Sequence, residues 1–302
     1  MEKKRSKWRY FGWTVLIILI LWIIIFLFPR EKRIEHAFFT SEGPLVIAHQ
    51  GGKDLAPSST LEAFQNAKEL GVDVIEFDIH MTKDGHLVAI HDDTVDRTTD
   101  GEGRVNDLTL EEVQSLDAGA NFQDLNGNYS FRNQGMIIPS LEEIFENIPD
   151  MRWNIEIKAT NDPDLYESIS EKLWKTIQDY GLEDDALIVS FDQEIIDMVE
   201  DASGGHALIA GGRAEVTKFV IFHKLFLNGL YRPQVDAMQI PTEEGPINLE
   251  DKKLIRGAEK AGIDLHYWTI NKEDSMQKLI DLGAHGILTD RPDILIDLLD
   301  EK

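Results

Sequence analysis

Short apolar runs alternate along the chain with segments whose apolar residues recur at helical spacing. The runs that read as buried β-strands are Leu45–Ala48, Val72–Ile79, Leu87–His91, Trp153–Ile157, Leu187–Phe191, Ala237–Ile240, Leu265–Ile270 and Gly286–Thr289. The helical patterns between them are Thr60–Leu70, Leu110–Ser115, Leu141–Asn147, Asp164–Tyr180, Gln193–Asp201, Leu249–Ala261 and Asp274–Leu282. This alternation predicts a parallel sheet. Eight strands within about 250 residues favour a closed (β/α)8 TIM barrel that spans residues 44–302.

The N-terminal segment has a different pattern. Residues 10–28 are overwhelmingly apolar and carry no formal charge and no proline. A helix of about 20 such residues spans a bilayer core. Five basic residues precede the run and three follow it, which predicts a cytoplasmic basic segment at 1–9, a transmembrane helix at 10–28 and an extracytoplasmic domain on a tether at 29–43. A cleaved signal peptide fits less well, because the run is long and no small-residue cleavage site follows it.

Charge is distributed unevenly between these two parts. The first 33 residues hold eight Lys or Arg and two Glu, a net charge of +6. Because the whole chain has a net charge of −25, residues 34–302 have a net charge of −31. Such an acidic body repels nucleic acid and anionic lipid headgroups, which argues against both as partners of its surface. An anionic substrate therefore needs a local positive centre, which a bound divalent cation supplies. The absence of cysteine excludes disulfides, zinc–thiolate sites and cysteine nucleophiles.

Acidic residues occur on the second and the fourth of the predicted strands. Glu76 and Asp78 are two positions apart and so share one face of the second strand, as do Glu156 and Lys158 on the fourth. Converging carboxylates repel one another unless a cation lies between them, which predicts a hard divalent metal, Mg²⁺ or Ca²⁺. A single acidic pair on a strand more often faces solvent. The prediction therefore rests on the finding that four consecutive predicted strands have carboxylates or histidines at matching ends.

Histidines end two of the predicted strands. His49 ends the first and is followed by Gln50 and two glycines, and His91 ends the third. An imidazole exchanges protons near neutral pH, which suits general acid and base catalysis. A lone histidine at a strand end is more often a hydrogen-bonded packing residue. The pairing with the carboxylates favours a catalytic role here.

Several sequence motifs that contain these residues occur in the same order as in a known enzyme family. The chain resembles the glycerophosphodiester phosphodiesterase family over residues 45–295, most strongly at 74–105. The other motifs follow in the family's order and spacing: IAHQGG (47–52), NIEIK (154–158), YWTIN (267–271) and GILTDRP (286–292). The resemblance implies a metal-dependent enzyme that hydrolyses a phosphodiester to a phosphomonoester and an alcohol. In glycerol substrates it implies attack by a neighbouring hydroxyl and a cyclic intermediate that water opens.

The resemblance also implies a role for each candidate residue. The implied roles are His49 and His91 as the acid/base pair, Glu76, Asp78 and Glu156 as metal ligands, Lys158 as the phosphate contact and Trp268 as the pocket wall near the alcohol.

Two positions depart from the family's usual pattern. Gln50 stands where the family usually has an arginine, and it can hydrogen-bond a phosphate oxygen without supplying charge. Ser58 stands where the family usually has a metal-binding glutamate. Ser58 itself, a water, Asp54 or His80 are the alternatives for the missing ligand. Arg213 is either a replacement for the missing positive charge or a solvated loop residue.

The segment after the predicted fifth strand is unusually apolar. Phe219, Phe222, Phe226 and Leu230 recur at helical spacing, which fits a helix that packs on the barrel. The alternative is an apolar wall near the membrane that accepts an acyl chain. The leading hypothesis is hydrolysis of a glycerophosphodiester or lysophospholipid at the outer membrane face. The alternatives are a non-catalytic phosphoglycerol-binding protein of the same fold and a hydrolase of a phosphoglycerol cell-wall polymer.

Overall fold

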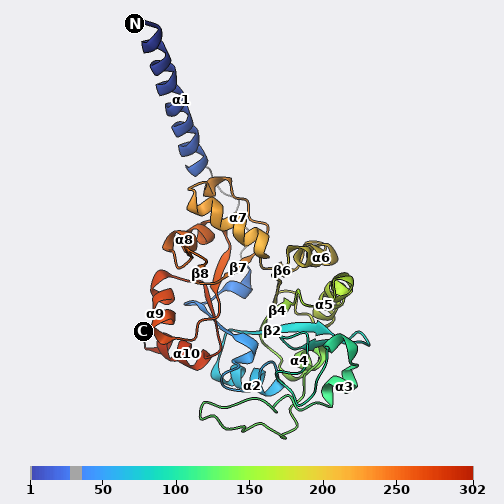
Figure 1. Cartoon of the computed structure of the whole chain (residues 1–302). Helices are drawn as coiled ribbons and strands as arrows, with labels where there is room; N and C mark the ends of the chain where they lie inside the picture. The colour runs from blue at the N-terminus through green and yellow to red at the C-terminus, as the bar shows by residue number, and fades with distance from the viewer. Residues whose placement is uncertain (1, 28–35, 302) are drawn as a thin grey trace.

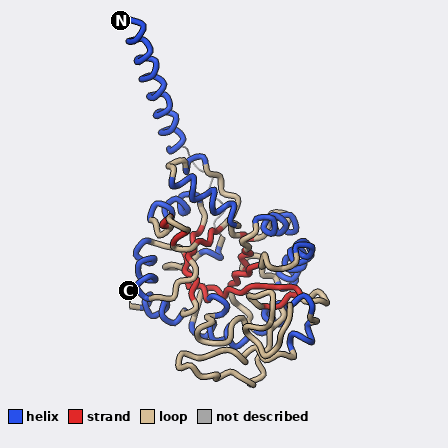
Figure 2. The backbone as a smooth tube through the Cα atoms, viewed as in Figure 1, coloured by secondary structure: helices blue, strands red, loops and turns tan. Residues whose placement is uncertain are grey.

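The computed structural model describes residues 2–27 and 36–301 and confirms the barrel (Figure 1; Figure 2). Eight parallel strands pair in the order β6-β5-β4-β2-β1-β11-β10-β7. Their bounds are β1 (Leu45–Ala48), β2 (Val74–Met81), β4 (Arg152–Ile157), β5 (Ala186–Val189), β6 (Leu208–Ile209), β7 (Ala237–Ile240), β10 (Asp264–Tyr267) and β11 (Gly286–Thr289). A single parallel bridge between Ala210 and Ala237 joins the two ends of this order, so the ring is nearly closed.

Helices surround the ring (Figure 2). They are α2 (Leu61–Leu70), α3 (Leu110–Gln114), α4 (Leu141–Asn147), α5 (Tyr166–Tyr180), α6 (Gln193–Ser203), α7 (Arg213–Lys224), α8 (Lys252–Ala261), α9 (Glu273–Leu282) and α10 (Pro292–Asp300). Local signals set their ends: the Thr60 side chain accepts a hydrogen bond from the Ala63 amide at the start of α2, and Gly71 ends that helix with φ 86°. The sequence pattern did not predict α10.

One predicted strand is not part of the barrel. β3 (Leu87–Ala89) pairs antiparallel with the end of β2, where Met81 lies opposite Leu87. The sequence prediction of a third barrel strand at 87–91 was therefore wrong, because β2 is eight residues long and continues past the pairing with β4 into a hairpin. The eighth strand is instead β6, which has only two residues and shows no periodic pattern.

The N-terminal end of the barrel is filled by apolar side chains. Phe38, in the short 3-10 helix η1 (Ala37–Phe39), is 1% exposed and belongs to one buried apolar cluster with Leu45, Val74 and Leu208. The Arg152 guanidinium donates to the carbonyl oxygen of Phe38 at 2.7 Å. Part of the segment predicted as a tether thus packs on the barrel. The opposite end, where the strands point, is left for the site.

The long helix α1 (Glu2–Leu27) extends away from the barrel (Figure 1). Its stretch Trp8–Ile25 has a mean hydropathy of 2.0 and is long and apolar enough to cross a membrane, a test that a signal sequence also passes. Position 28 of the predicted span and 29–35 of the predicted tether lie outside the described residues. The end of α1 lies beside η5 (Asn228–Leu230), where a Cβ on Gly229 would stand 1.8 Å from the Ile25 carbonyl oxygen.

Candidate active site

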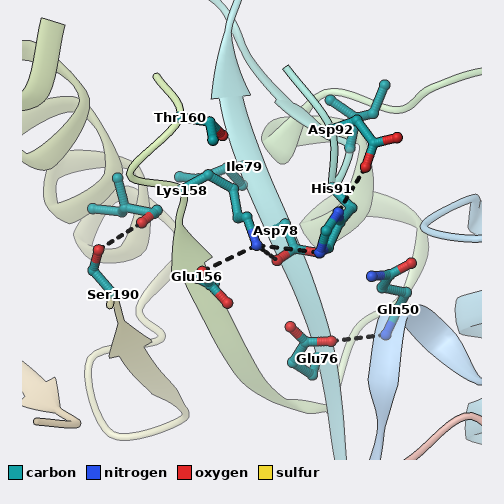
Figure 3. Close-up of polar contacts among 12 residues, drawn as sticks. Gln50, Glu76, Asp78, Ile79, His91, Asp92, Glu156, Lys158, Thr160 and Ser190 are labelled. Carbon is teal, nitrogen blue, oxygen red and sulfur yellow. Dashed lines mark hydrogen bonds and ion pairs between the residues drawn. The ribbon is translucent and has the colours of Figure 1, made fainter. Parts of the chain in front are cut away.

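Three buried carboxylates lie together at the barrel mouth (Figure 3). Glu76 and Asp78 point from β2, and the register of the adjacent β4 places Glu156 beside Asp78. The three residues are 3%, 1% and 9% exposed, and one oxygen from each lies within 4.8 Å of the others. The structure therefore brings together the three predicted metal ligands.

Repulsion within this cluster is strong because water is excluded from it. Burial and the neighbouring Asp78 raise the pKa of both Glu76 and Glu156. Lys158 partly compensates, with its ammonium 3.2 Å from Asp78 Oδ1 and 3.2 Å from Glu156 Oε1. Burial opposes the lysine's charge, but these two carboxylates outweigh it and raise the pKa of Lys158 to about 12.

The donor set fits a divalent cation. One lysine charge faces three carboxylates, so negative charge remains uncompensated. Among the described residues, the buried Oδ2 of Asp78 has no hydrogen-bond partner. Buried unpaired oxygens are costly, and hard cations such as Mg²⁺ and Ca²⁺ prefer oxygen ligands of this kind. A metal could be held by Glu76, Asp78 and Glu156.

His49 is held by a carboxylate from the far end of the chain. It follows β1, and its Nδ1–H donates to Asp290 Oδ1 at 2.5 Å. Asn271 donates from Nδ2 to the other oxygen of Asp290 at 2.7 Å. Burial disfavours a charged imidazole, but Glu76 and Asp290 outweigh it and raise the pKa of His49 above its ordinary value. The bond at Nδ1 leaves Nε2 of the neutral ring without a proton, as a general base requires.

His91 has a similar partner within its own loop. Its Nδ1–H donates to Asp92 Oδ1 at 2.7 Å (Figure 3). Arg97 donates from Nε to Asp92 Oδ2 at 2.6 Å. Burial opposes ionisation, but the hydrogen bonds from Arg97 and His91 lower the pKa of Asp92 to about 2. Lys158 Nζ lies 3.3 Å from His91 Nε2, which connects this histidine to the carboxylate cluster.

The two positions that depart from the family pattern touch each other. Ser58 Oγ donates to Gln50 Oε1 at 2.7 Å, and the Gln50 backbone N–H donates to Glu76 Oε2 at 2.8 Å. Gln50 is 2% exposed with φ 51°, and a Cβ on the following Gly51 would lie 2.8 Å from the Phe64 ring, so the turn is tightly packed. A neutral pair thus occupies the two positions where the family usually has an arginine and a glutamate.

Of the alternatives for the missing ligand, the side chains of Asp54 and His80 do not belong to the carboxylate cluster. His80 lies within hydrogen-bond reach of the Ile90 carbonyl at 2.9 Å and of Thr160 Oγ1 at 3.0 Å. Asp54 lies in a separate polar crevice beside Ser58. The group of carboxylates placed for a metal in the described part of the chain contains neither of them.

A cavity of about 440 Å³ opens above the carboxylates and extends across the barrel mouth. His49, His91 and Lys158 line one side of it. Trp268, which follows β10, lines the cavity and meets the Phe191 ring edge-on at 5.4 Å between centroids. Arg213 also lines it, at the first residue of α7.

Sequence reasoning missed the residues that orient the two histidines. Asp290 and Asn271 lie in the motifs GILTDRP and YWTIN, and Asp92 directly follows His91. Asp290 comes immediately after β11, so its place at a barrel strand end was the available signal.

The family model described as "Glycerophosphoryl diester phosphodiesterase family" matches residues 49–294. The chain belongs to this glycerophosphoryl diester phosphodiesterase family. A glycerophosphodiester phosphodiesterase of Caldanaerobacter subterraneus subsp. tengcongensis is 37% identical over 257 residues, which cover 84% of this chain and 97% of the relative. A lysophospholipase D of Homo sapiens is 27% identical and covers 95% of this chain and 94% of its own length. Membership and these relatives make the protein a phosphoric diester hydrolase.

Solved structures of family members share the fold. A glycerophosphoryl diester phosphodiesterase domain from Mycobacterium tuberculosis matches with a TM-score of 0.74 at 20% identity, covering 86% of this chain and all of that domain. A phosphodiesterase from Oleispira antarctica, solved with the product sn-glycerol 3-phosphate, matches with a TM-score of 0.69 at 24% identity, covering 85% of this chain and 97% of its own.

Proposed function

We propose that this enzyme cleaves a glycerophosphodiester or a lysophospholipid to a phosphomonoester and an alcohol, with Mg²⁺ or Ca²⁺ held by Glu76, Asp78 and Glu156. The observation that carries the proposal is the buried carboxylate cluster beside two histidines, each with its own carboxylate partner. The relatives that are named for activity on these two substrate classes support it.

Each residue has a defined task in this proposal. A divalent ion in the cluster would neutralise phosphoryl oxygens and make an attacking hydroxyl more acidic. One of His49 and His91 takes the proton from that hydroxyl at Nε2, and the other donates a proton to the leaving alcohol oxygen, which leaves a cyclic phosphodiester. Water then opens this ring: one histidine takes a proton from the water and the other returns one to the substrate oxygen that attacked, which gives the phosphomonoester. Lys158 binds a non-bridging phosphate oxygen, Gln50 hydrogen-bonds another, and Trp268 lines the pocket beside the alcohol.

The placement of the enzyme at a membrane is part of the same proposal. The segment 10–28 serves as an uncleaved anchor, the basic residues 1–9 stay in the cytoplasm, and the domain from residue 44 works at the outer face of the cell membrane. The excess of positive charge before the span supports this orientation. Protease protection of the barrel in spheroplasts, with digestion of residues 1–9, would contradict it.

A non-catalytic phosphoglycerol-binding protein is the second candidate. The Gln50–Ser58 pair favours it, because the usual charged residues of the family are absent from both positions. Hydrolysis of a phosphoglycerol cell-wall polymer is a third, which an outer location permits.

A substrate panel on the full chain in lipid nanodiscs separates these candidates. Glycerophosphocholine, lysophosphatidylcholine and a polyglycerophosphate polymer are each tested with Mg²⁺, with Ca²⁺ and with chelator. Turnover that needs metal is expected, and His49→Ala and His91→Ala each lower kcat by about 10²- to 10⁴-fold. His206→Ala, an exposed histidine before β6, serves as the matched control. Full activity of His49→Ala would refute the mechanism, and binding without turnover under either metal would favour the second candidate.

A further inference from the structure

The cavity has an apolar side that the proposed chemistry does not use. Opposite the histidines it is lined by Val216, Val220 and Ile221 of α7, by Ile247 of the short strand β9 (Ile247–Asn248) and by Leu249. A glycerophosphate group and a small alcohol are polar and have nothing to bury against these side chains. An apolar wall continuous with a phosphoryl site fits a substrate that has both a phosphodiester and a hydrocarbon part.

This wall does not end inside the protein. Ile221 is 50% exposed and Ile247 is 44% exposed although both line the cavity. Leu225, Phe226 and Leu230 continue the apolar surface beyond α7 and are 60%, 48% and 47% exposed. Contiguous exposed apolar side chains of this size mark a contact with lipid or protein rather than with water.

Polar contacts hold the two sides of this surface together. Lys224 at the end of α7 donates to the Asn248 carbonyl at 2.9 Å and pairs with Asp251 at 2.6 Å. The Lys253 ammonium lies 5.0 Å from the centre of the Phe226 ring. The end of α7 is therefore fixed beside the β9 segment, and the exposed residues after α7 lie next to the cavity rim.

We call this apolar surface, from the cavity wall on α7 and β9 to Leu225, Phe226 and Leu230, the apolar strip. The strip leads to the end of α1 that lies nearest the barrel. Leu230 belongs to η5, whose Gly229 lies against the Ile25 carbonyl at the end of the apolar helix. Figure 1 shows α7 between the barrel and that end of α1. A twelve-residue helix is about 18 Å long, so an acyl chain can bridge the distance from a membrane surface to the cavity.

The charges around the strip indicate that it binds the hydrocarbon chain of the substrate rather than the substrate's headgroup. Lys218 and Lys224, which flank the strip, are paired with Glu215 and Asp251. The acidic body beyond them repels anionic headgroups. We infer that the strip is an acyl-chain site, which admits the single chain of a lysophospholipid from the bilayer while its phosphodiester lies at the carboxylate cluster. This inference deepens the proposed function and rests on it.

A chain-length series tests the acyl site. The full chain in zwitterionic nanodiscs is given glycerophosphocholine and lysophosphatidylcholines with short saturated chains of increasing length, below the concentrations at which they form micelles. Each methylene buried on the strip is expected to raise kcat/KM about three- to fourfold. In Ile221→Glu/Ile247→Glu this slope becomes nearly flat. Both positions are exposed, so the fold tolerates the change, which a thermal unfolding scan checks.

Leu125→Glu is the matched control, because Leu125 is a 62% exposed leucine that does not line the cavity. It should keep the wild-type slope. Calorimetric binding of the same series, corrected for empty nanodiscs, gives the slope of affinity even if no substrate is turned over. Loss of turnover with a retained binding slope would refute the proposed function and support the acyl site. A flat wild-type slope, or an unchanged slope in the double variant, would overturn the acyl site whatever the activity.

Discussion

Replacement of Asp290 by asparagine tests how the structure prepares His49 for proton transfer. In the wild type, Asp290 accepts from His49 Nδ1–H on one oxygen and from Asn271 Nδ2 on the other. The side-chain amide of Asn271 cannot flip, because its Oδ1 accepts hydrogen bonds from the backbone N–H of Asp290 at 2.9 Å and from Thr289 Oγ1 at 3.2 Å. In Asp290→Asn the new carbonyl oxygen must therefore face Asn271, and the new NH₂ faces His49.

This arrangement puts the proton on the wrong ring nitrogen. With an NH₂ group opposite Nδ1, the neutral ring carries its proton on Nε2 and cannot accept one from a substrate hydroxyl. A flip of the amide would set two NH₂ groups against each other, and an unmade buried hydrogen bond costs about 1–3 kcal/mol. Loss of the aspartate's negative charge also makes the protonated imidazolium form of His49 less stable. We expect kcat to fall about 100-fold, within the range of about 10²–10⁴ for general acid–base catalysis, with little change in KM.

Steady-state kinetics on glycerophosphocholine measure both parameters. Asp293→Asn, which removes a nearby carboxylate paired with Arg291, is the control and should change kcat less than about threefold. Asp290→Asn/Asn271→Ala should recover about tenfold in kcat, because the asparagine carbonyl is then free to face Nδ1–H. A folded Asp290→Asn enzyme with near wild-type kcat, or a double variant slower than the single one, would refute this account of the tautomer.

Two further predictions concern the carboxylates and the Gln50–Ser58 pair. In chelator, the unfolding midpoint should fall as pH rises from the ordinary glutamate pKa of 4.5 toward the raised folded-state values of Glu76 and Glu156, because the folded state binds more protons there than the unfolded state. Glu156→Gln should flatten that slope and so should saturating Mg²⁺ or Ca²⁺; a midpoint that rises with pH in chelator would contradict the assignment. Gln50→Arg alone should destabilise the fold by about 3 kcal/mol, since it buries an unpaired guanidinium, and Ser58→Glu should restore most of that loss. Denaturant unfolding of the two single variants and the double variant measures the coupling, and purely additive effects would show that the two side chains do not pair.

The relationship between sequence and site is clearest for the metal cluster. The spacing of Glu76 and Asp78 requires that they share a face of one strand, because side chains alternate along it. Eight alternating units predicted the barrel and the end of it at which function gathers. The charge and apolar pattern of the N-terminal segment identified a helix able to span a bilayer, and α1 has that form. These features depend on local periodicity and composition, which a linear chain displays directly.

Other features depended on contacts between distant parts of the chain. Asp290 is 241 positions from His49, and only closure of the ring between β1 and β11 brings them together. The hairpin that carries His91 formed because β2 extends past its pairing with β4, a length that its apolar pattern does not specify. The hydrogen bond between Ser58 and Gln50 likewise joins two departures that look independent in the sequence. Periodicity encodes which face a residue occupies, whereas barrel closure and loop packing decide which residues become partners, and those depend on the whole chain at once.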